Sequence, residues 1–538
     1  MPLEAGIGKS LETDRIIGEY IAGGGQRRFL LVKQFLEDVN ASVERINSHR
    51  TGELERLLIP WVIGISHKNW HEYRDNLSSI ANYRVVVITH QRYLQLCEDE
   101  SIRGYFADRR DTLVIDEALN MRVATFSDAE YRRMNALLPI PFLPQLHEVC
   151  SGLLHEIAVR PKLTPGASLV SCRPHIDNLA IIREFSDVVD ANMGSIPFQH
   201  WQDVEQFVRS LPILYQNQCL YSRKQLSAVD PNLKPWTLAN NIVMDAAGEI
   251  DHRYRLNPMV TIDHQIPIID HSHWTLRQIP YNSSASSINS TTNYTEELVK
   301  HIVSRHSPAD RTLVVTRIQF EDKLKSMLSE AYANNVTVEH FGNIVGKNHW
   351  RDYTQIWIAV TPLLPMEMYV LYWSMATGEP FDEHHLKTVT TKGRKVNLQF
   401  QDTDVESIRF GYVVSEMYQA IKRINRDNRY PAEVFVVTQD DAIIAALQNQ
   451  LPGIKIGEPI VMDVHKETKT AAKETTAQRL AEYLKTLPPG QYTKQQIYSA
   501  IGIDKSNFGR ALKDAEIAGL VQARLIRISR WRIEVLAH

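Results

Sequence analysis

The chain has 538 residues, of which 43% are apolar and 23% are charged, and its formal net charge at pH 7 is −3. A chain of this length is too long for one hydrophobic core, so several domains are expected, and the ordinary composition excludes a largely disordered protein. The near-neutral charge excludes a uniformly basic coat for nucleic acid, but it does not exclude a local basic surface.

The sequence contains no membrane or disulfide signal. No apolar run reaches the roughly 18 residues that a membrane span needs, and the N-terminus lacks the basic and apolar segments of a signal peptide. The cysteines Cys97, Cys150, Cys172 and Cys219 form no Cys-x-x-Cys pair, so neither a disulfide framework nor a zinc or iron–sulfur motif is indicated. We therefore expect a cytoplasmic protein without membrane contact.

The first 120 residues have the pattern of an α/β domain. Short runs rich in β-branched residues, at 27–35, 83–90 and 112–118, alternate with helical or polar stretches, which predicts a parallel sheet covered by helices. Helical spacing dominates from about residue 120 to residue 235, so we expect a mostly helical insertion there. Strand character returns at 240–248.

A second α/β pattern follows a Ser- and Asn-rich stretch at 281–293, which we interpret as a linker. Its predicted strands are residues 312–317, 336–341, 354–361 and 432–439. A charged stretch at 465–476 predicts a second linker. Residues 476–538 contain ten Lys and Arg against five Asp and Glu, so positive charge is concentrated at this end of the chain.

The first chemical motif is AGIGKS at residues 5–10. A Gly-x-Gly-Lys-Ser run that opens a helix is typical of a phosphate-binding loop, in which Gly6 and Gly8 let backbone N–H groups approach phosphate oxygens. Lys9 would reach the β- and γ-phosphates of a nucleotide, and the Ser10 hydroxyl would contact Mg²⁺. The alternative is a tight turn with an incidental lysine, because Leu3 stands where the full pattern has a glycine.

The second motif is TLVIDEAL at residues 112–119. An apolar strand that ends in Asp-Glu places two carboxylates at the C-terminal edge of a parallel sheet, where α/β proteins bind ligands. Asp116 would hold Mg²⁺ through water, and Glu117 would orient and deprotonate the attacking water. The alternative role for such a pair is to cap the next helix.

The third motif is QAIKRINR at residues 419–426. Arg423 and Arg426 are three residues apart, so on a helix they would share one face. Two permanent cations at this spacing, next to Gln419, suit a γ-phosphate whose charge grows in the transition state. The alternative is a solvated basic helix face.

The order of these motifs resembles that of superfamily 2 helicases over residues 2–460, and the XPD/DinG-like and the phage or mobile-element DEAD/DEAH-type helicases are the most similar branches. The resemblance implies an α/β fold with two RecA-like motor domains, each a parallel sheet with flanking helices. It places the first motor domain at residues 1–120 and 236–280, an arch-like helical insertion at 121–235, and the second motor domain at 294–462.

The resemblance also implies roles for residues outside the three motifs. Asp245, in IVMDAAGEIDHRY, would couple hydrolysis to movement. The residues placed against nucleic acid are Thr89, His90, His340, Gly342, Asn343 and Asn348. Four features depart from the helicase pattern: Leu119 follows Asp-Glu-Ala where His is frequent, the coupling motif reads Asp-Ala-Ala without its Thr, Lys422 replaces a usual Gly, and only Cys97 precedes Asp116. Because of the last feature, no iron–sulfur cluster is expected.

After a linker at 463–475, the tail resembles a winged helix-turn-helix. Its predicted helices are residues 475–487, 492–502, with Thr493 as the N-cap, and 504–520, and a hairpin follows at 520–536. The third helix and the wing would contact duplex DNA through Lys505, Asn507, Arg510, Arg524, Arg527, Arg530 and Arg532. The alternative is a winged helix that docks protein.

These features predict an ATP-dependent DNA helicase or translocase that uses ATP and Mg²⁺. Single-stranded DNA would cross the motor domains and duplex DNA would bind the winged helix, with replication, repair or defence proteins as further partners. The alternative is a catalytically weak or inert ATP-binding scaffold that recruits partners to DNA. Only residues 1–4 precede the phosphate loop, fewer than a strand needs, so we expect a longer protein or an open slot beside the strand that ends at Asp116.

Overall fold

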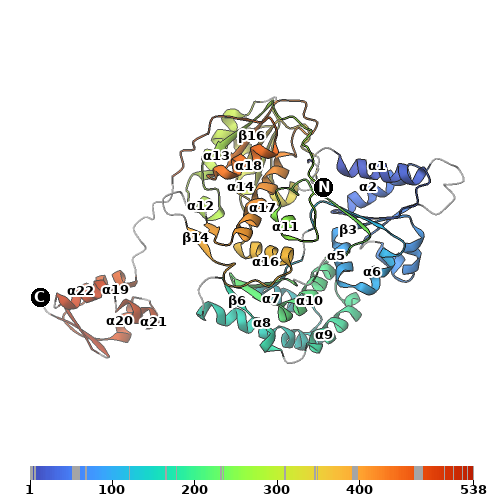
Figure 1. The fold of residues 1–538 in the computed structure, drawn as a ribbon. Helices are drawn as coiled ribbons and strands as arrows, with labels where there is room; N and C mark the ends of the chain where they lie inside the picture. Colours follow the sequence, from blue (N-terminus) through green and yellow to red (C-terminus); the bar gives the residue numbers. More distant parts are fainter. Residues whose placement is uncertain are drawn as a thin grey trace. The chain divides into compact units, whose positions relative to one another are not determined.

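The computed structural model describes all of the chain except residues 1–3, 5–7, 51–60, 67–68, 120–121, 164–166, 177–178, 231–232, 234, 308–309, 332, 345–346, 348, 391–397, 466–475, 502, 504, 513, 524, 530 and 537–538. The chain forms two compact units, Met1–Ile288 with Thr295–Asp463, and Asn289–Tyr294 with Val464–His538 (Figure 1). Among the described residues, no helix combines the length and the apolarity needed to cross a bilayer.

The first sheet of the larger unit is parallel throughout and has the strand order β2-β3-β1-β4-β9. Its strands are β1 (Phe29–Lys33), β2 (Val62–Ile65), β3 (Val85–Thr89), β4 (Thr112–Asp116) and β9 (Asn240–Met244). The three strands predicted before residue 120 are confirmed as β1, β3 and β4, whose apolar runs are buried because helices cover both faces of the sheet.

Each face of the first sheet has its own helices (Figure 1). Apolar side chains of α1 (Lys9–Ala22) and α2 (Leu36–Asn47) pack against one face. Apolar side chains of α5 (His90–Glu98) and α6 (Glu100–Ala107) pack against the other face. The short helix α4 (Trp70–Arg74) also contributes to the second of these cores. The C-terminal ends of β1 and β4 are thereby held at one edge of the sheet.

The open slot expected beside the strand ending at Asp116 is not there. β1 pairs with one side of β4 and β9 pairs with the other. β9 comes from a segment more than 100 residues further along the chain, and the sequence pattern of a strand does not disclose its neighbour in a sheet.

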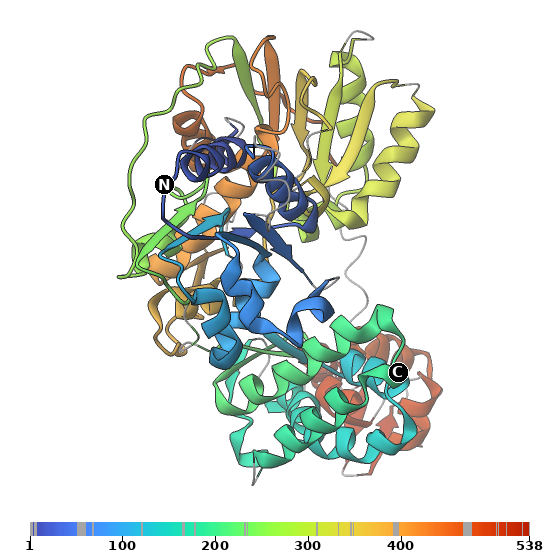
Figure 2. The same ribbon diagram turned by 90° about the vertical axis from the view of Figure 1, so that its right-hand side faces the viewer.

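The insertion is helical but also contains a sheet that the sequence analysis missed. Its helices are α7 (Asp128–Leu137), α8 (Leu143–Leu163), α9 (Ala180–Ala191) and α10 (Trp201–Gln216), seen in teal and green in Figure 2. An antiparallel sheet of order β5-β8-β7-β6 joins them. Its strands are β5 (Ala124–Ser127), β6 (Ser168–Val170), β7 (Cys219–Ser222) and β8 (Gln225–Ala228). These strands are three or four residues long, too short to show a period of two.

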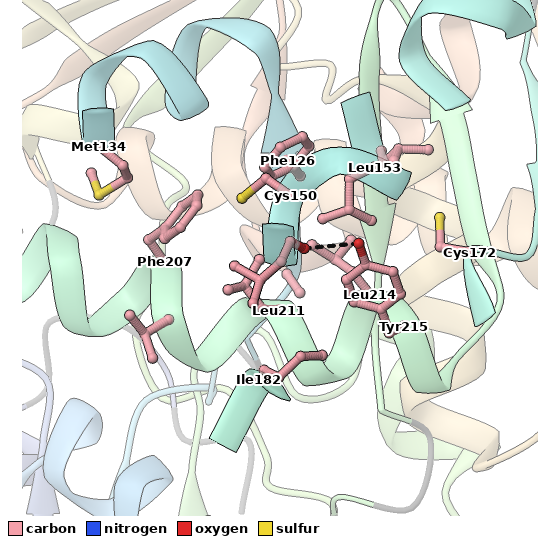
Figure 3. Packing of buried hydrophobic residues seen from close by; sticks show 14 of the residues in the cluster. Phe126, Met134, Cys150, Leu153, Cys172, Ile182, Phe207, Leu211, Leu214 and Tyr215 are labelled. Atoms are coloured by element: carbon pink, nitrogen blue, oxygen red, sulfur yellow. Dashed lines mark hydrogen bonds between the residues drawn. The ribbon is translucent and has the colours of Figure 1, made fainter. Parts of the chain in front are cut away.

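The insertion has a continuous apolar core, shown in Figure 3. Phe126, Cys150 and Leu211 are fully buried in it, and the buried Tyr215 hydroxyl donates to the carbonyl of Val149 at 2.8 Å. Burial raises the pKa of the Cys150 thiol far above its usual range. This thiol therefore packs as a small apolar side chain.

The second sheet is also parallel, with the order β12-β11-β13-β16-β10-β17. Its strands are β10 (Trp274–Ile279), β11 (Thr312–Thr316), β12 (Val336–His340), β13 (Gln355–Ile358), β16 (Ala432–Val437) and β17 (Lys455–Ile456). The flanking helices are α12 (Ala285–Asn289), α13 (Tyr294–Arg305), α14 (Ile318–Glu330), α15 (Phe341–Ile344), α16 (Met366–Thr377), α17 (Thr403–Ile421) and α18 (Asp441–Gln450). A hairpin, β14 (Thr388–Thr390) and β15 (Leu398–Phe400), precedes α17. The expected α/β fold of two parallel sheets with flanking helices is confirmed.

The larger unit has two halves, one built around each parallel sheet, and two predicted boundaries between these halves are wrong. β10 pairs with β16 and β17, so residues 274–279, which were assigned to the first motor domain, belong to the second sheet. The Ser/Asn-rich stretch at 281–293 is no solvated linker. Its buried Ser283 hydroxyl donates to the carbonyl of Val437 at 2.6 Å and accepts the N–H of Thr361 at 2.9 Å. In this stretch a polar side chain therefore forms the hydrogen bonds that buried backbone N–H and C=O groups need.

In its described residues, the smaller unit contains four helices and a three-stranded antiparallel sheet of order β18-β20-β19. Its elements are α19 (Thr476–Thr486), β18 (Gly490–Thr493), α20 (Lys494–Ala500), α21 (Lys505–Ala511), α22 (Ala515–Gln522), β19 (Ile526–Ile528) and β20 (Arg532–Val535). The helix predicted over residues 504–520 is thus two helices. Thr493 caps α20 as predicted, in a capping box with Gln496. Leu480, Phe508 and Ile533 lie in the shared core.

Candidate functional site

The described end of the predicted phosphate-binding loop is the N-terminus of α1. Gly8, at φ +82°, is the N-cap of α1, a left-handed conformation that glycine adopts without strain. The helix begins at Lys9, so its unpaired N–H groups and its dipole favour an anion at this end. Gly6 lies outside the described residues.

Asp116 ends β4 directly opposite the start of α1. Its Oδ2 accepts the Ser10 hydroxyl at 2.5 Å and the Lys33 ammonium at 3.0 Å. Its Oδ1 is buried and has no hydrogen-bond partner in the described part of the chain. A buried carboxylate oxygen without a partner costs free energy, so this atom is poised for a ligand.

The residues present fit a magnesium ion that arrives with nucleotide phosphates. The Ser10 hydroxyl and Asp116 Oδ1 are the hard oxygen donors that Mg²⁺ prefers, and such sites complete their shell with phosphate oxygens and water. Within the described ranges, no group of three or more His, Cys, Asp or Glu side chains could hold a metal by itself. The absence of an iron–sulfur cluster stays a prediction.

Glu117 has the position and the pKa of a general base. Its backbone is in the left-handed region, at φ +69°, and its N–H donates to the carbonyl of Met244 at 3.0 Å. Burial raises the pKa of its carboxyl to about 7, with smaller upward contributions from Asp245 and Asp116 and opposing ones from Lys9 and Arg423. The side chain is 36% exposed, into the pocket, and Lys9 Nζ lies 3.9 Å from its Oε1.

The second half of the larger unit supplies the cations of the site. Gln419 lies on the last turn of α17, but that helix ends at Ile421, so Arg423 and Arg426 follow it in turns and do not share a helical face as predicted. Asn425, at φ +41°, breaks the helical pattern between the two arginines. Burial lowers the pKa of Arg423 to about 10 and also lowers that of Arg426, and both stay protonated at neutral pH.

One cavity of about 590 Å³ collects the nucleotide residues predicted from the sequence. The lining includes Gly8, Lys9, Ser10, Asp116, Glu117, Asp245, Gln419, Arg423 and Arg426. The first six come from the first half and the last three from the second half. Neither half alone contains the complete set.

Lys422, which replaces a usual glycine, joins the two halves beside this cavity. Its ammonium lies 3.5 Å from Glu4 Oε1 and donates to His271 Nε2 at 2.9 Å. Glu4 Oε2 accepts the N–H groups of Ile268 and Ile269 at 3.0 and 3.1 Å. Burial and the neighbouring Lys422 lower the pKa of His271 to about 4, so this imidazole is neutral and can accept the bond. The departure from the helicase pattern thus forms a buried polar link.

Asp245, which the sequence places in a motif without its usual threonine, accepts two hydrogen bonds in the structure. Its Oδ1 accepts the N–H of Ala247 at 2.9 Å and its Oδ2 accepts the Tyr254 hydroxyl at 3.0 Å. The adjacent Arg253 donates to both carboxylate oxygens of Asp251, and its guanidinium lies 5.0 Å from the centre of the Tyr372 ring on α16. The helicase pattern gave no signal for Tyr254.

The described residues of the two sheets that were expected to contact nucleic acid do not line the cavity. Thr89 caps α5 by accepting the N–H of Arg92 at 3.2 Å, and His90 Nε2 bonds to the Asp116 carbonyl at 2.8 Å. Burial lowers the pKa of His90, so this ring is neutral and donates. His90 therefore touches the nucleotide site through the backbone of Asp116.

The corresponding residues of the second half lie at the C-terminal end of β12. His340 Nδ1 lies 2.5 Å from Glu321 Oε2, and the Asn343 amide donates to Glu339 at 2.5 Å. Gly342 is on α15, and Asn348 lies outside the described residues.

The predicted DNA residues of the smaller unit are described only in part. Lys505, Asn507 and Arg510 are on α21, where Asn507 is exposed. Arg527 on β19 has a side chain that is 76% exposed, and Arg524 and Arg530 lie outside the described residues. The Arg532 guanidinium donates to Gln491 at 3.0 Å, which holds it against β18.

Comparison with models of protein families gives no match, and comparison with curated proteins finds no relative. Solved structures similar to this chain include S. tokodaii Xpd4, with 14% identity, 83% of this chain and 99% of that chain covered, and a TM-score of 0.44. S. cerevisiae Dbp5 bound to RNA and ADP BeF3 has 9% identity, coverages of 86% and 84%, and a TM-score of 0.36. Mycobacterium smegmatis helicase Lhr bound to ssDNA and AMP-PNP has 10% identity, coverages of 98% and 55%, and a TM-score of 0.33. At these values, conclusions about activity have to come from the site itself.

Proposed function

We propose that this protein is an ATP-hydrolysing motor of the superfamily 2 helicase type that moves on DNA. The observation that carries the proposal is the single cavity in which motifs from both halves meet. Phosphate recognition would come from Gly8, Lys9 and Ser10, base catalysis from Glu117, and stabilisation of the transferred phosphoryl group from Arg423 and Arg426. Because Glu117, Arg423 and Arg426 line the same cavity, an ATP molecule there would have its γ-phosphate between the base and the cations.

The roles of the residues follow from their chemistry. Glu117 would orient the attacking water and accept its proton, for which a pKa of about 7 is close to ideal. Lys9 and the two arginines would neutralise charge that develops on the phosphoryl oxygens. Magnesium, when bound, would supply further neutralisation of the phosphates. Asp116 and Ser10 would hold it.

Movement would follow from the division of the cavity between the halves. ATP contacts made by both halves favour a closed arrangement, and hydrolysis removes some of those contacts. Asp245 and its partner Tyr254 connect the catalytic edge to Arg253, whose guanidinium lies over Tyr372 of the second half. We assign coupling to this route, and the strand-binding role to the residues at the C-terminal ends of β3 and β12 and the helices that follow them: Thr89, His90, His340 and Asn343.

DNA binding is proposed for the smaller unit as a winged helix. The excess of Lys and Arg in residues 476–538 supports it, as do the exposed Asn507 on α21 and Arg527 on β19. Trp531, between β19 and β20, is 71% exposed and adds an aromatic surface to the same hairpin as Arg527.

The decisive experiment is a steady-state ATPase assay without nucleic acid, with single-stranded DNA and with single-stranded RNA. The motor proposal predicts Mg²⁺-dependent hydrolysis that DNA stimulates. Stimulation by RNA alone would overturn the choice of DNA. Hydrolysis no greater than that of Glu117→Gln under all three conditions would favour the alternative, an ATP-binding scaffold.

A further inference from the structure

Lys33 is a buried cation that sequence analysis did not single out. It is the last residue of β1, and its side chain is 2% exposed. Its ammonium lies 3.0 Å from Asp116 Oδ2 and 3.7 Å from Asp14 Oδ1. Lysine is almost never fully buried unless it is paired, so the two carboxylates account for its position.

The second carboxylate, Asp14, belongs to the helix that begins at the phosphate loop. Asp14 is fully buried on α1, one turn after Ser10. Its Oδ2 accepts the Ser42 hydroxyl at 2.8 Å and the Arg45 guanidinium at 2.6 Å. Lys33 therefore bridges α1 and the end of β4, while Arg45 provides additional compensation for Asp14.

We propose that Lys33 is a positioning residue that controls how strongly Asp116 attracts the divalent cation that accompanies the nucleotide. The inference rests on the proposed nucleotide-binding function. Lys33 and Ser10 occupy Oδ2, which leaves the unpartnered Oδ1 to face the ligand. A fixed ammonium beside Asp116 also opposes a second cation, and this repulsion is strong where water is excluded. The metal then binds well only together with the negative phosphates.

A purely structural role for Lys33 makes a different prediction. If Lys33 only held Asp116 in place, its removal would misplace the carboxylate and weaken metal binding. If the charge of Lys33 opposes the metal, a neutral side chain strengthens metal binding. Removing the Asp14 carboxylate should weaken metal binding, because Asp116 alone would then balance the positive charge of Lys33.

The test measures Mn²⁺ binding by electron paramagnetic resonance, with and without the ATP analogue AMP-PNP, so that no turnover is involved. We expect Lys33→Met and Lys33→Gln to bind Mn²⁺ at least about tenfold more tightly than wild type in the presence of AMP-PNP. Lys33→Gln keeps an N–H donor for Asp116 and covers the case in which Lys33→Met does not fold. Lys33→Arg should retain wild-type affinity, and Asp14→Asn should bind several-fold more weakly.

The matched control is Lys300→Met, on α13, where the exposed Lys300 pairs with Glu297 and neither residue lines the cavity. Weaker Mn²⁺ binding by both neutral Lys33 variants, or affinity equal to wild type, would overturn the inference. A wild-type protein that binds neither AMP-PNP nor Mn²⁺ would instead contradict the proposed function, so the two failures are distinguishable.

Discussion

At the scale of single residues, Glu117 and Lys9 should decide whether the cavity hydrolyses ATP. Glu117→Gln removes the base and Lys9→Ala removes a cation from the phosphates. Each should lower ATP turnover about 10²- to 10⁴-fold, because general bases and charge-stabilising groups contribute on this scale. Arg426→Ala should lower turnover in the same way while ATP still binds. Steady-state turnover and equilibrium nucleotide binding, measured on each variant, check this.

The control for these variants is Arg132→Ala on α7, whose side chain is 76% exposed, pairs with Asp128 and does not line the cavity. It should leave turnover unchanged. Wild-type turnover no higher than that of Glu117→Gln would contradict the assignment of the base.

The raised pKa of Glu117 predicts a pH dependence of activity. Only the ionised carboxylate can accept a proton, so kcat/KM, which reports the free enzyme, should rise with pH through about 7. A carboxyl with an ordinary pKa would already be fully ionised by about pH 6. The measurement is ATP hydrolysis at subsaturating ATP across this range, with the nucleotide affinity of Glu117→Gln at each pH as the control for ionisation of ATP. A flat profile between about pH 6 and 8 would contradict it.

The raised pKa of Glu117 also makes the stability of the fold depend on pH. The folded-state pKa of Glu117 is about 7, against 4.5 for the ordinary carboxyl, so the folded chain binds this proton more tightly than the unfolded chain. Ionisation of Glu117 therefore destabilises the fold as pH rises through this interval. Glu117→Gln removes the effect, so its Tm relative to wild type should be higher at about pH 8 than at about pH 5. An equal Tm difference at both pH values would show that the carboxyl is not perturbed.

At the scale of elements, the ion pair between Lys422 and Glu4 joins the turn after α17 to the segment before α1. Lys422→Met removes the cation and leaves the Glu4 carboxylate buried with two backbone donors only. Breaking a buried pair on one side costs about 3–5 kcal/mol. We expect the lower end of this range, because the two N–H donors remain. Urea unfolding of the variant, with the slope m compared with wild type, measures it.

A surface pair provides the matched comparison. Lys323→Met on α14 removes an ion pair with Glu296 on α13, in which the two side chains are 52% and 46% exposed. An exposed pair contributes about 0.2–1 kcal/mol. Equal losses of stability for Lys422→Met and Lys323→Met would mean that Lys422 does not join the two halves.

The elements also show which inferences a sequence permits. The strands β1, β3 and β4 and the loop at Gly8 follow from local patterns, because a buried parallel strand is a continuous apolar run and a helix start has a recognisable cap. β10 and the positions of Arg423 and Arg426 do not follow, since strand pairing and helix termination depend on partners far along the chain. Lys33 and Tyr254 were missed because each acts through a hydrogen bond to another residue. Lys33 contacts Asp116, more than 80 residues away, and Tyr254 contacts Asp245, nine residues away.

At the scale of the whole molecule, the net charge of the chain is −3, yet residues 476–538 contain ten Lys and Arg against five Asp and Glu. If the smaller unit is the main duplex-binding surface, the electrostatic part of DNA affinity is concentrated there. Every nucleotide residue of the cavity precedes it in the chain. Loss of the smaller unit should therefore separate DNA binding from catalysis.

We predict that deletion of residues 476–538 weakens duplex binding and reduces its salt dependence, while basal ATP hydrolysis is retained. Each phosphate contact that is lost should flatten the slope of log affinity against log salt concentration by about 0.9. The measurement is duplex affinity across a salt series for the full and the shortened chain. Arg527→Gln on β19 should remove about one phosphate contact and flatten the slope accordingly. Arg132→Ala on α7 should leave the slope unchanged. Superimposable curves for the full and shortened chains would mean that the smaller unit binds protein and that DNA is held by the larger unit.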